Sequence, residues 1–222
     1  MLLRIRVRLP DRPGSLGRVA RMLGAAGADV VQMAVLERDG GRALDDFTVV
    51  WPAGAGFERL LDGLGSVPGV QPVGVWQTVE PQGAYPDAAL IGQLASAPER
   101  GPLTLADAVP GLLSADWAGL AEGGPDGHAL VHCSLGAAPE PDLPDLAPLR
   151  PRAFTAPDGT QFAICPIGGP EDGAWVLVVA RTGAPPFHRT EVSRLAQLVG
   201  AAEAVLGGRG TGTKGPDLVR TS

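Results

Sequence analysis

The sequence predicts an α+β fold in two parts, and three observations support this. Residues 3–9 alternate strictly between apolar and charged side chains, the period of a half-buried strand. Residues 16–23 repeat apolar side chains at intervals of three and four, the period of an amphipathic helix. The stretch 80–87, with two prolines and a glycine among polar residues, separates these patterns from a second set of strands and helices.

The first part begins with a strand whose two faces differ in character. Its apolar face carries Leu3, Ile5, Val7 and Leu9, and its charged face carries Arg4, Arg6 and Arg8. Pro10 and Pro13 are expected to end the strand, because proline donates no ladder hydrogen bond. A helix is predicted from Ser15 to Ala26, with Gly24 and Gly27 bracketing its end.

Four more elements complete the first part. A second strand is expected at 29–38, a hairpin turn at 39–41, a return strand at 44–51, a helix at 57–64 and a fourth strand at 70–79. The order strand–helix–strand–strand–helix–strand is the ferredoxin-like arrangement. Both helices should therefore cover one face of a four-stranded antiparallel sheet and leave the other face open.

The charged face of the first strand should lie on this open face, with Asp46 on the neighbouring return strand. Two interpretations of the arginines follow. They form a solvated ladder of ion pairs, each contributing roughly 0.2–1 kcal/mol. Alternatively, they face an acidic partner surface, which the second part of the chain would supply.

The second part has its own series of elements. Helices are predicted at 89–94 and 103–113, the latter interrupted by Pro110, and strands at 115–121 and 129–135. A proline-dense loop at 138–151 follows, then a hairpin of strands 152–155 and 161–167, a buried strand at 174–181 and a helix at 189–206. Thr190 is its expected N-cap, with Glu191 in the first turn. Residues 207–222 form a glycine-rich polar tail that is expected to be flexible.

Composition limits the function classes. The 222 residues carry a net charge of −6 with a pI near 5.0, which argues against nucleic acid or an anionic membrane as partner. The N-terminus has no signal-peptide pattern, and no apolar run approaches the ~20 residues of a membrane span. A cytoplasmic protein is expected. Cys133 and Cys165 lie in apolar runs without metal-ligand spacing and are expected to be buried hydrophobes.

The loop between the first strand and helix is the candidate ligand site. Asp11-Arg12-Pro13-Gly14 has turn chemistry and leads into a helix N-terminus, where unpaired backbone N–H groups attract a carboxylate or phosphate. Gly14 allows a ligand to approach the backbone closely. The amides near Gly14, Ser15 and Leu16 are the expected donors.

The Asp-Arg-Pro-Gly-Ser-Leu loop, together with Gly27-Ala-Asp-Val, resembles the start of an ACT domain, a small regulatory module that in many proteins binds amino acids. The resemblance implies an amino-acid ligand bound where two modules meet, and hence a homodimer. Asp11 and Asp29 would accept hydrogen bonds from the ligand ammonium, or would only close a turn and cap a strand. The implied site comprises Asp11, Arg12, Pro13, Gly14, Ser15, Leu16, Asp29, Val30 and Val31.

The second part resembles a reduced GAF domain, an α+β fold with an antiparallel sheet and helices at both ends. The resemblance rests on residues 103–120 and on the closing stretch 176–195, in which a strand ends in Arg181 and leads through Phe187 to Glu191 and a helix. The loop 138–151 is shorter than the usual ligand lid of that family, so a large cofactor is not expected. The implied boundaries are an ACT-like domain at 1–79, a linker at 80–87, a GAF-like domain at 88–206 and the tail at 207–222.

The sequence shows no recognisable catalytic or metal-binding set. His128 and His132 would lie about 13 Å apart in a strand, too far for one metal ion. The main hypothesis is therefore a non-catalytic regulatory sensor without cofactor or metal. A ligand-free assembly module that regulates a protein partner is the first alternative. The second is a small-molecule enzyme that uses His128, His132 or His188.

Overall fold

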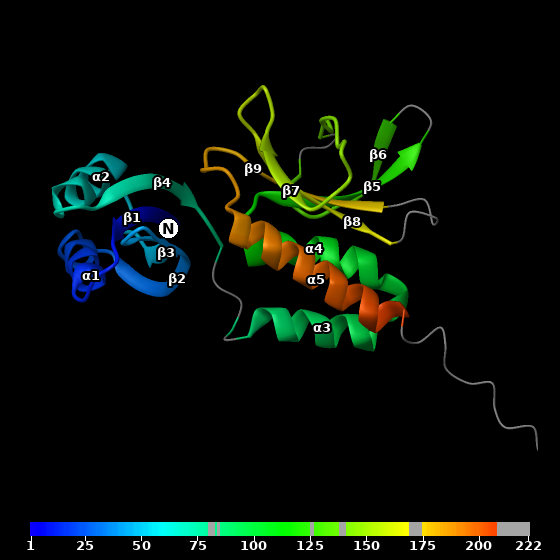
Figure 1. Ribbon diagram of the computed structural model, residues 1–222, viewed down its shortest axis with the longest axis horizontal. Helices are drawn as coiled ribbons and strands as arrows, with labels where there is room; N and C mark the ends of the chain where they lie inside the picture. The colour runs from blue at the N-terminus through cyan, green and yellow to red at the C-terminus, as the bar shows by residue number, and fades with distance from the viewer. Residues whose placement is uncertain (80–82, 84, 125–126, 138–140, 169–174, 208–222) are drawn as a thin grey trace, which may run out of the picture.

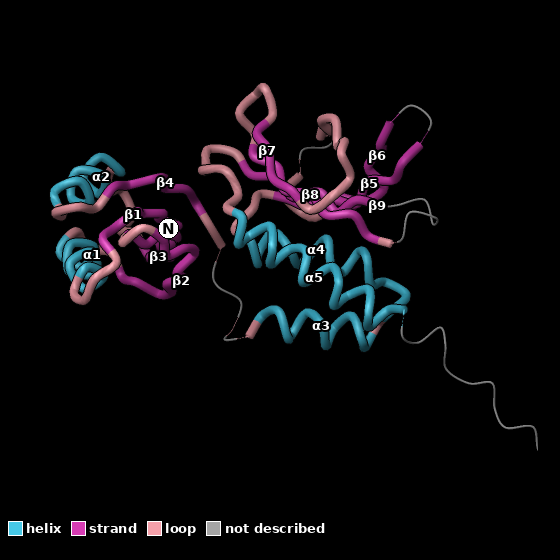
Figure 2. Tube along the Cα trace, in the orientation of Figure 1, coloured by secondary structure: helices cyan, strands magenta, loops and turns pink. Residues whose placement is uncertain are grey.

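The computed structural model describes residues 1–79, 83, 85–124, 127–137, 141–168 and 175–207 (Figure 1). These residues form two antiparallel sheets, one of four strands and one of five, each with helices on one face (Figure 2). We refer to residues 1–79 as the N-terminal module and to residues 85–207 as the second module. The predicted α+β class is confirmed.

The N-terminal module has the predicted order of elements. They are β1 (Leu2–Pro10), α1 (Ser15–Ala25), β2 (Asp29–Asp39), β3 (Arg42–Val50), α2 (Phe57–Ser66) and β4 (Gln71–Gln77). The sheet order is β2-β3-β1-β4, and every pairing is antiparallel. The central strand β1 thus pairs on both sides, whereas β2 and β4 form the edges.

The alternation in β1 places its apolar residues in the core. Leu3, Ile5, Val7 and Leu9 are at most 2% exposed, and they pack with residues of α1, α2 and β3. Burial of each such side chain contributes about 1.5–3 kcal/mol. Both helices lie on the side of the sheet away from the second module (Figure 1), so the arginine face of β1 points toward that module.

The end of α1 explains how the chain turns into β2. Gly27 has φ +88°, a left-handed conformation that glycine adopts without strain. Its N–H donates to the Gly24 carbonyl (3.0 Å), and the Ala28 N–H donates to the Leu23 carbonyl (2.9 Å). This pair of bonds is the Schellman motif, which satisfies carbonyls that the helix leaves free.

The second module follows the predicted pattern with small shifts in bounds. Its elements are α3 (Pro86–Ser96), a 3₁₀ turn (Pro98–Arg100), α4 (Gly101–Leu113), β5 (Trp117–Gly124), β6 (Gly127–Cys133), β7 (Arg152–Thr155), β8 (Gln161–Ile167), β9 (Trp175–Arg181) and α5 (Arg189–Gly207). Helix α3 starts at Pro86, inside the expected linker, because proline is well suited to a first helical turn. Half of that linker and all but the first residue of the expected tail lie outside the described residues.

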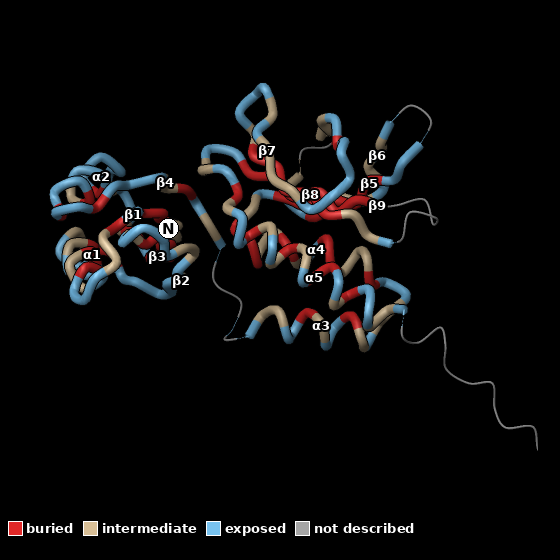
Figure 3. Tube along the Cα trace, viewed as in Figure 1, coloured by how far each residue is buried: buried red, intermediate tan, exposed pale blue. Residues whose placement is uncertain are grey.

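The five-stranded sheet, in the order β6-β5-β9-β8-β7, is covered on one face by helices. Helices α4 and α5 lie directly on the sheet, and α3 packs against both of them (Figure 1). Pro110 lies within α4 rather than interrupting it. The buried residues between helices and sheet form one apolar core, visible as the red segments in Figure 3.

The opposite face of this sheet is covered by the chain itself. Leu146, from the proline-dense loop between β6 and β7, is 1% exposed and packs among Trp117, Phe162 and Ile164. Leu143 and Phe154 pack at the margin of the same cluster. Side chains therefore occupy the space between this loop and the sheet.

Replacing Leu146 by alanine should lower the free energy of unfolding by about 2–5 kcal/mol, because it opens a cavity in this cluster. Leu149 is the matched control, since it belongs to the same loop but is 42% exposed. Leu149→Ala should change the stability by less than about 0.5 kcal/mol. Equal losses in urea denaturation of the two variants would show that the loop does not pack as described.

Candidate functional site

The candidate ligand loop opens at the start of α1. Gly14 precedes the helix with φ +82°, and no side chain caps the helix. The Ser15 N–H donates to the Arg12 carbonyl at 3.2 Å, so this amide is engaged in a turn. Among the described residues, no hydrogen bond is found for the Leu16 N–H, which lies in the first helical turn. One of the three expected donors is thus used internally, and the helix end stays open.

Asp11 has a partner of its own. Its carboxylate accepts two hydrogen bonds from the Arg38 guanidinium, both at 2.9 Å, and its N–H donates to the Gly41 carbonyl at 2.9 Å. Asp11 therefore ties the loop to the end of β2. The ion pair also offsets the negative charge that Asp11 would otherwise present to an anionic ligand.

The remaining predicted site residues lie on β2, an edge strand with an unusual apolar surface. Asp29, Val30 and Val31 start the strand and are exposed, the two valines at 37% and 46%. Met33 and Val35 are also exposed. The pairing with β3 shifts register between Val30 and Gln32 and again between Val35 and Glu37, as expected for bulges at a sheet edge.

The structure does not bring all predicted residues together within one chain. The loop of Asp11 lies beside Arg38, near the end of β2, whereas Asp29 is at its start. Arg38 is the ninth residue after Asp29 along the strand, which corresponds to about 30 Å at about 3.3 Å per residue. A single chain therefore presents two half sites at opposite ends of one edge strand.

Asp45 is a buried carboxylate that the sequence patterns did not indicate. It lies on β3 opposite Val7 and Val35, is 2% exposed, and its Oδ1 atom has no hydrogen-bond partner among the described residues. Burial, with the nearby charges of Asp11 and Asp46, raises its pKa from 3.8 to about 6.

The open face of the N-terminal sheet is not a solvated ladder of ion pairs. Arg6 is 2% exposed and donates to both oxygens of Asp46, at 2.7 and 2.8 Å. It also donates to Glu191 of α5 at 2.9 Å. Of the two interpretations of the arginine face, the one with an acidic surface from the second part of the chain is confirmed for Arg6, whereas Arg8 remains exposed.

Glu191 accepts hydrogen bonds from both modules. Arg181, at the end of β9, donates to its Oε1 atom at 3.0 Å, and Arg6 donates to its Oε2 atom. Burial would raise the pKa of Glu191, but the charges of Arg181 and Arg6 hold it below its ordinary value. We call Arg4, Arg6, Asp46, Arg181 and Glu191 the arginine junction.

Aromatic and backbone contacts close the arginine junction. The Trp76 ring of β4 lies 5.4 Å from the Arg6 guanidinium and 5.2 Å from that of Arg181. Gly74 allows the loop after β9 to approach, since a Cβ atom there would lie 2.8 Å from Pro185. The loop after β9 therefore packs closely against the backbone of β4, on the open face of the N-terminal sheet.

The start of α5 differs from the prediction. The helix begins at Arg189, so Thr190 is not the N-cap. Instead the Glu191 carboxylate accepts a hydrogen bond from the His188 N–H at 2.7 Å. This back-bond from the third helical residue is one half of a capping box. The same side chain thus fixes the helix start and joins the two modules.

The three histidines do not assemble a catalytic set in the described part of the chain. His132 pairs with Asp107 at 2.8 Å and His188 pairs with Glu37 at 3.0 Å. The bond from His188, with the charge of Arg189, lowers the pKa of Glu37. No group of three metal-ligating side chains occurs among the described residues, and no helix there has the length and apolarity to cross a membrane.

Comparison with protein families identifies the N-terminal module. Residues 3–51 match the model of the ACT domain. The chain therefore carries an ACT domain at this position, as the loop and the Gly27-Ala-Asp-Val stretch predicted. ACT domains are regulatory modules, and this supports a regulatory, ligand-binding role. A comparison with curated proteins gives no significant match.

Solved structures resemble the second module or the whole chain at low identity. A GAF domain from an Acinetobacter phosphoenolpyruvate-protein phosphotransferase is 12% identical with a TM-score of 0.43, covering 59% of this chain and 96% of its own. A GAF domain of a proposed Pseudomonas syringae pv. tomato sensor histidine kinase is 16% identical (TM-score 0.37; 55% and 88%). A proposed glycine cleavage system transcriptional repressor is 12% identical (TM-score 0.32; 93% and 92%).

Replacing Asp45 by asparagine should stabilise the protein near neutral pH. The folded-state pKa of about 6 exceeds the ordinary 3.8, so wild-type stability falls as pH rises through this range. The asparagine side chain stays neutral. The difference in melting temperature between the variant and wild type should therefore shift in favour of the variant as the pH rises from about 4 to about 7. Asp39→Asn, at an exposed position, should show no such pH-dependent gain.

Replacing Glu191 by glutamine should destabilise the protein by about 3–5 kcal/mol, because two buried guanidinium groups lose their shared charge. Glu58→Gln is the matched control, since Glu58 also lies in a first helical turn but is exposed. That variant should lose less than about 1 kcal/mol. Calorimetric unfolding of both variants measures the difference, and similar losses would mean that the arginine junction contributes little.

Proposed function

We propose that this protein is a non-catalytic cytoplasmic regulator that binds an amino acid at an interface between two ACT domains. The observation that carries this proposal is the open N-terminus of α1, which lies beside the apolar edge strand β2. Free amides and the positive end of the helix dipole suit a ligand carboxylate. Aspartate side chains suit the ligand ammonium.

The arrangement of the two half sites supports a homodimer. If β2 pairs antiparallel with β2 of a second copy, the Asp29 end of one strand meets the Asp11 loop of the other. Such pairing would use the unpaired backbone groups of the edge. It would also cover Val30, Val31, Met33 and Val35, whose exposure in a single chain is otherwise costly in water. Two complete sites would result, each built from both copies.

A signal from this site has a physical route to the second module. Glu37 of β2 pairs with His188, three residues before Glu191, and Asp46 on the neighbouring strand β3 holds Arg6. A ligand that ordered β2 would act on both contacts. The ligand can shift the two modules between alternative arrangements only by as much as its affinities for those arrangements differ.

A ligand-free assembly module is the second candidate, and one observation favours it. Asp11 is already paired with Arg38, so a ligand ammonium would compete with an existing bidentate contact. In this case dimerisation through β2 would persist without any amino acid. The protein would then act through a protein partner.

The test combines ligand screening with a dimer variant. The standard amino acids are added at millimolar concentration to the full chain, and thermal stability and sedimentation are measured. At least one amino acid should raise the melting temperature of wild type, in which the dimer is populated. Val35→Glu places a charge in the β2 interface and should abolish both the dimer and the ligand effect.

Val131→Glu is the matched control, since Val131 is also 49% exposed and lies on β6, the edge strand of the other sheet. This variant should keep both the dimer and the ligand effect. If the wild-type protein is a dimer whose melting temperature no amino acid changes, the assembly module takes the place of the sensor as the proposed function. A monomer that responds to none would remove both.

A further inference from the structure

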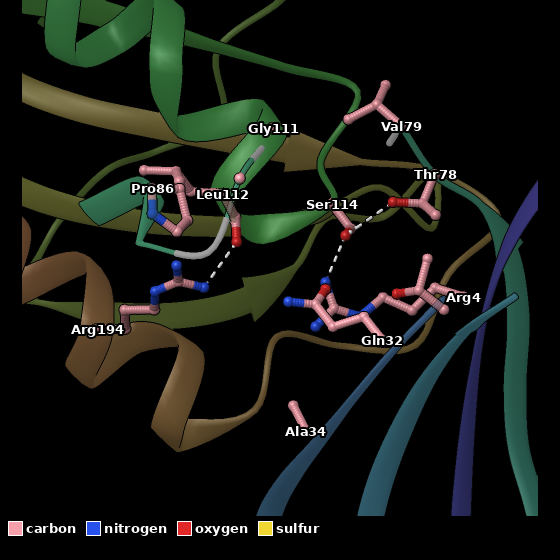
Figure 4. Close-up of a pocket in the computed structure, with 12 residues that line it drawn as sticks. Arg4, Gln32, Ala34, Thr78, Val79, Pro86, Gly111, Leu112, Ser114 and Arg194 are labelled. Atoms are coloured by element: carbon pink, nitrogen blue, oxygen red, sulfur yellow. Dashed lines mark hydrogen bonds between the residues drawn. The ribbon is translucent and has the colours of Figure 1, made fainter. Parts of the chain in front are cut away.

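A small cavity lies between the two modules, on the face of the N-terminal sheet opposite to helices α1 and α2. Its volume is about 80 Å³. Figure 4 shows Arg4 and Gln32 from the N-terminal sheet facing residues at the end of α4 and in α5. The polar side chains that line it are Arg4, Gln32, Thr48, Thr78, Ser114 and Arg194. It is separate from the loop of Asp11, because no residue of that loop lines it.

The hydroxyl of Ser114 is the centre of the hydrogen bonds in this cavity. It accepts from Arg4 Nη1 and from the Thr78 hydroxyl, the latter at 2.9 Å (Figure 4). Because the Ser114 oxygen accepts both of these hydrogen bonds, the hydrogen of its hydroxyl group is available to donate to a ligand. Ser114 has φ +50° at the end of α4, a conformation in which glycine would be less strained. The serine side chain is therefore held here against a backbone cost.

The charges around the cavity do not balance. Asp46 is shared by Arg6 and Arg4, the latter at 3.1 Å, and Glu191 is shared by Arg6 and Arg181. Three guanidinium groups of the arginine junction thus face two carboxylates. Arg194 contributes no excess, because it pairs with Asp87. The group that both lines the cavity and belongs to this positive cluster is Arg4, whose side chain is 12% exposed.

We propose that this cavity binds a small oxyanion, with inorganic phosphate or a small carboxylic acid as the two sources of that chemistry. An oxyanion would balance the third guanidinium group and accept hydrogen bonds from Arg4, Ser114 and Gln32. At about 10–15 Å³ for each water position, the cavity holds roughly five to eight such positions, enough for the five non-hydrogen atoms of phosphate. Because the ligand touches both modules, its binding stabilises their docked arrangement.

The experiment titrates the full chain with sodium phosphate, sodium sulfate and sodium acetate, with chloride holding ionic strength constant. Calorimetry and thermal shift should detect at least one of the three oxyanions in wild type. Arg4→Gln should weaken that binding by about tenfold or more. Gln32→Glu, on the exposed edge strand, adds a carboxylate to the cavity without touching the buried junction and should weaken it similarly.

Arg8→Gln is the matched control, because Arg8 lies on the same face of β1 but is exposed and outside the cavity. It should bind the oxyanion like wild type. Binding of phosphate and sulfate alone assigns the tetrahedral source, and binding of acetate alone assigns the carboxylate. The proposal is overturned if wild type binds none of the three, or if Arg4→Gln and Gln32→Glu bind as tightly as Arg8→Gln.

Discussion

The shared carboxylate of Glu191 is the contact on which the arrangement of this molecule depends. It accepts hydrogen bonds from Arg6 in the central strand of the ACT domain and from Arg181 in the second module. All three side chains are at most 5% exposed. Buried charges are costly unless they are paired. Separation of the modules would therefore either expose these three groups to water or leave them buried without a partner. The open sheet face is therefore covered by a specific surface rather than by solvent.

The edge strand β2 connects this junction with the candidate ligand site. One side carries the exposed apolar residues from Val30 to Val35, and the Asp11 loop is tied to its end through Arg38. The other side lines the space between the modules, where Glu37 pairs with His188. A single strand thus contacts the candidate ligand loop and the second module, and it leaves an apolar edge exposed. This gives a regulatory role a physical basis that neither module has alone.

The two faces of the sheet in the second module are both covered by apolar side chains, which leaves no ligand pocket on either face among the described residues. Helices cover one face, and Leu146 fills the other. A small polar cavity instead lies where α4 and α5 face the ACT domain. This cavity thus lies at the boundary between the modules, outside both apolar cores.

The sequence by itself determined the order of the helices and strands, the approximate bounds of most of them and the ACT loop, because these follow from local periodicity, turn residues and glycine positions. It also placed the arginines of β1 on one face. Only the tertiary structure decided that Glu191 and Arg181 meet Arg6 and that Asp45 is buried. These contacts join residues far apart in the chain, and no local pattern encodes such a distance. The physical reason is that the burial and pairing of a charged side chain depend on the surface that docks against it. The alternation of residues within one strand does not specify that surface.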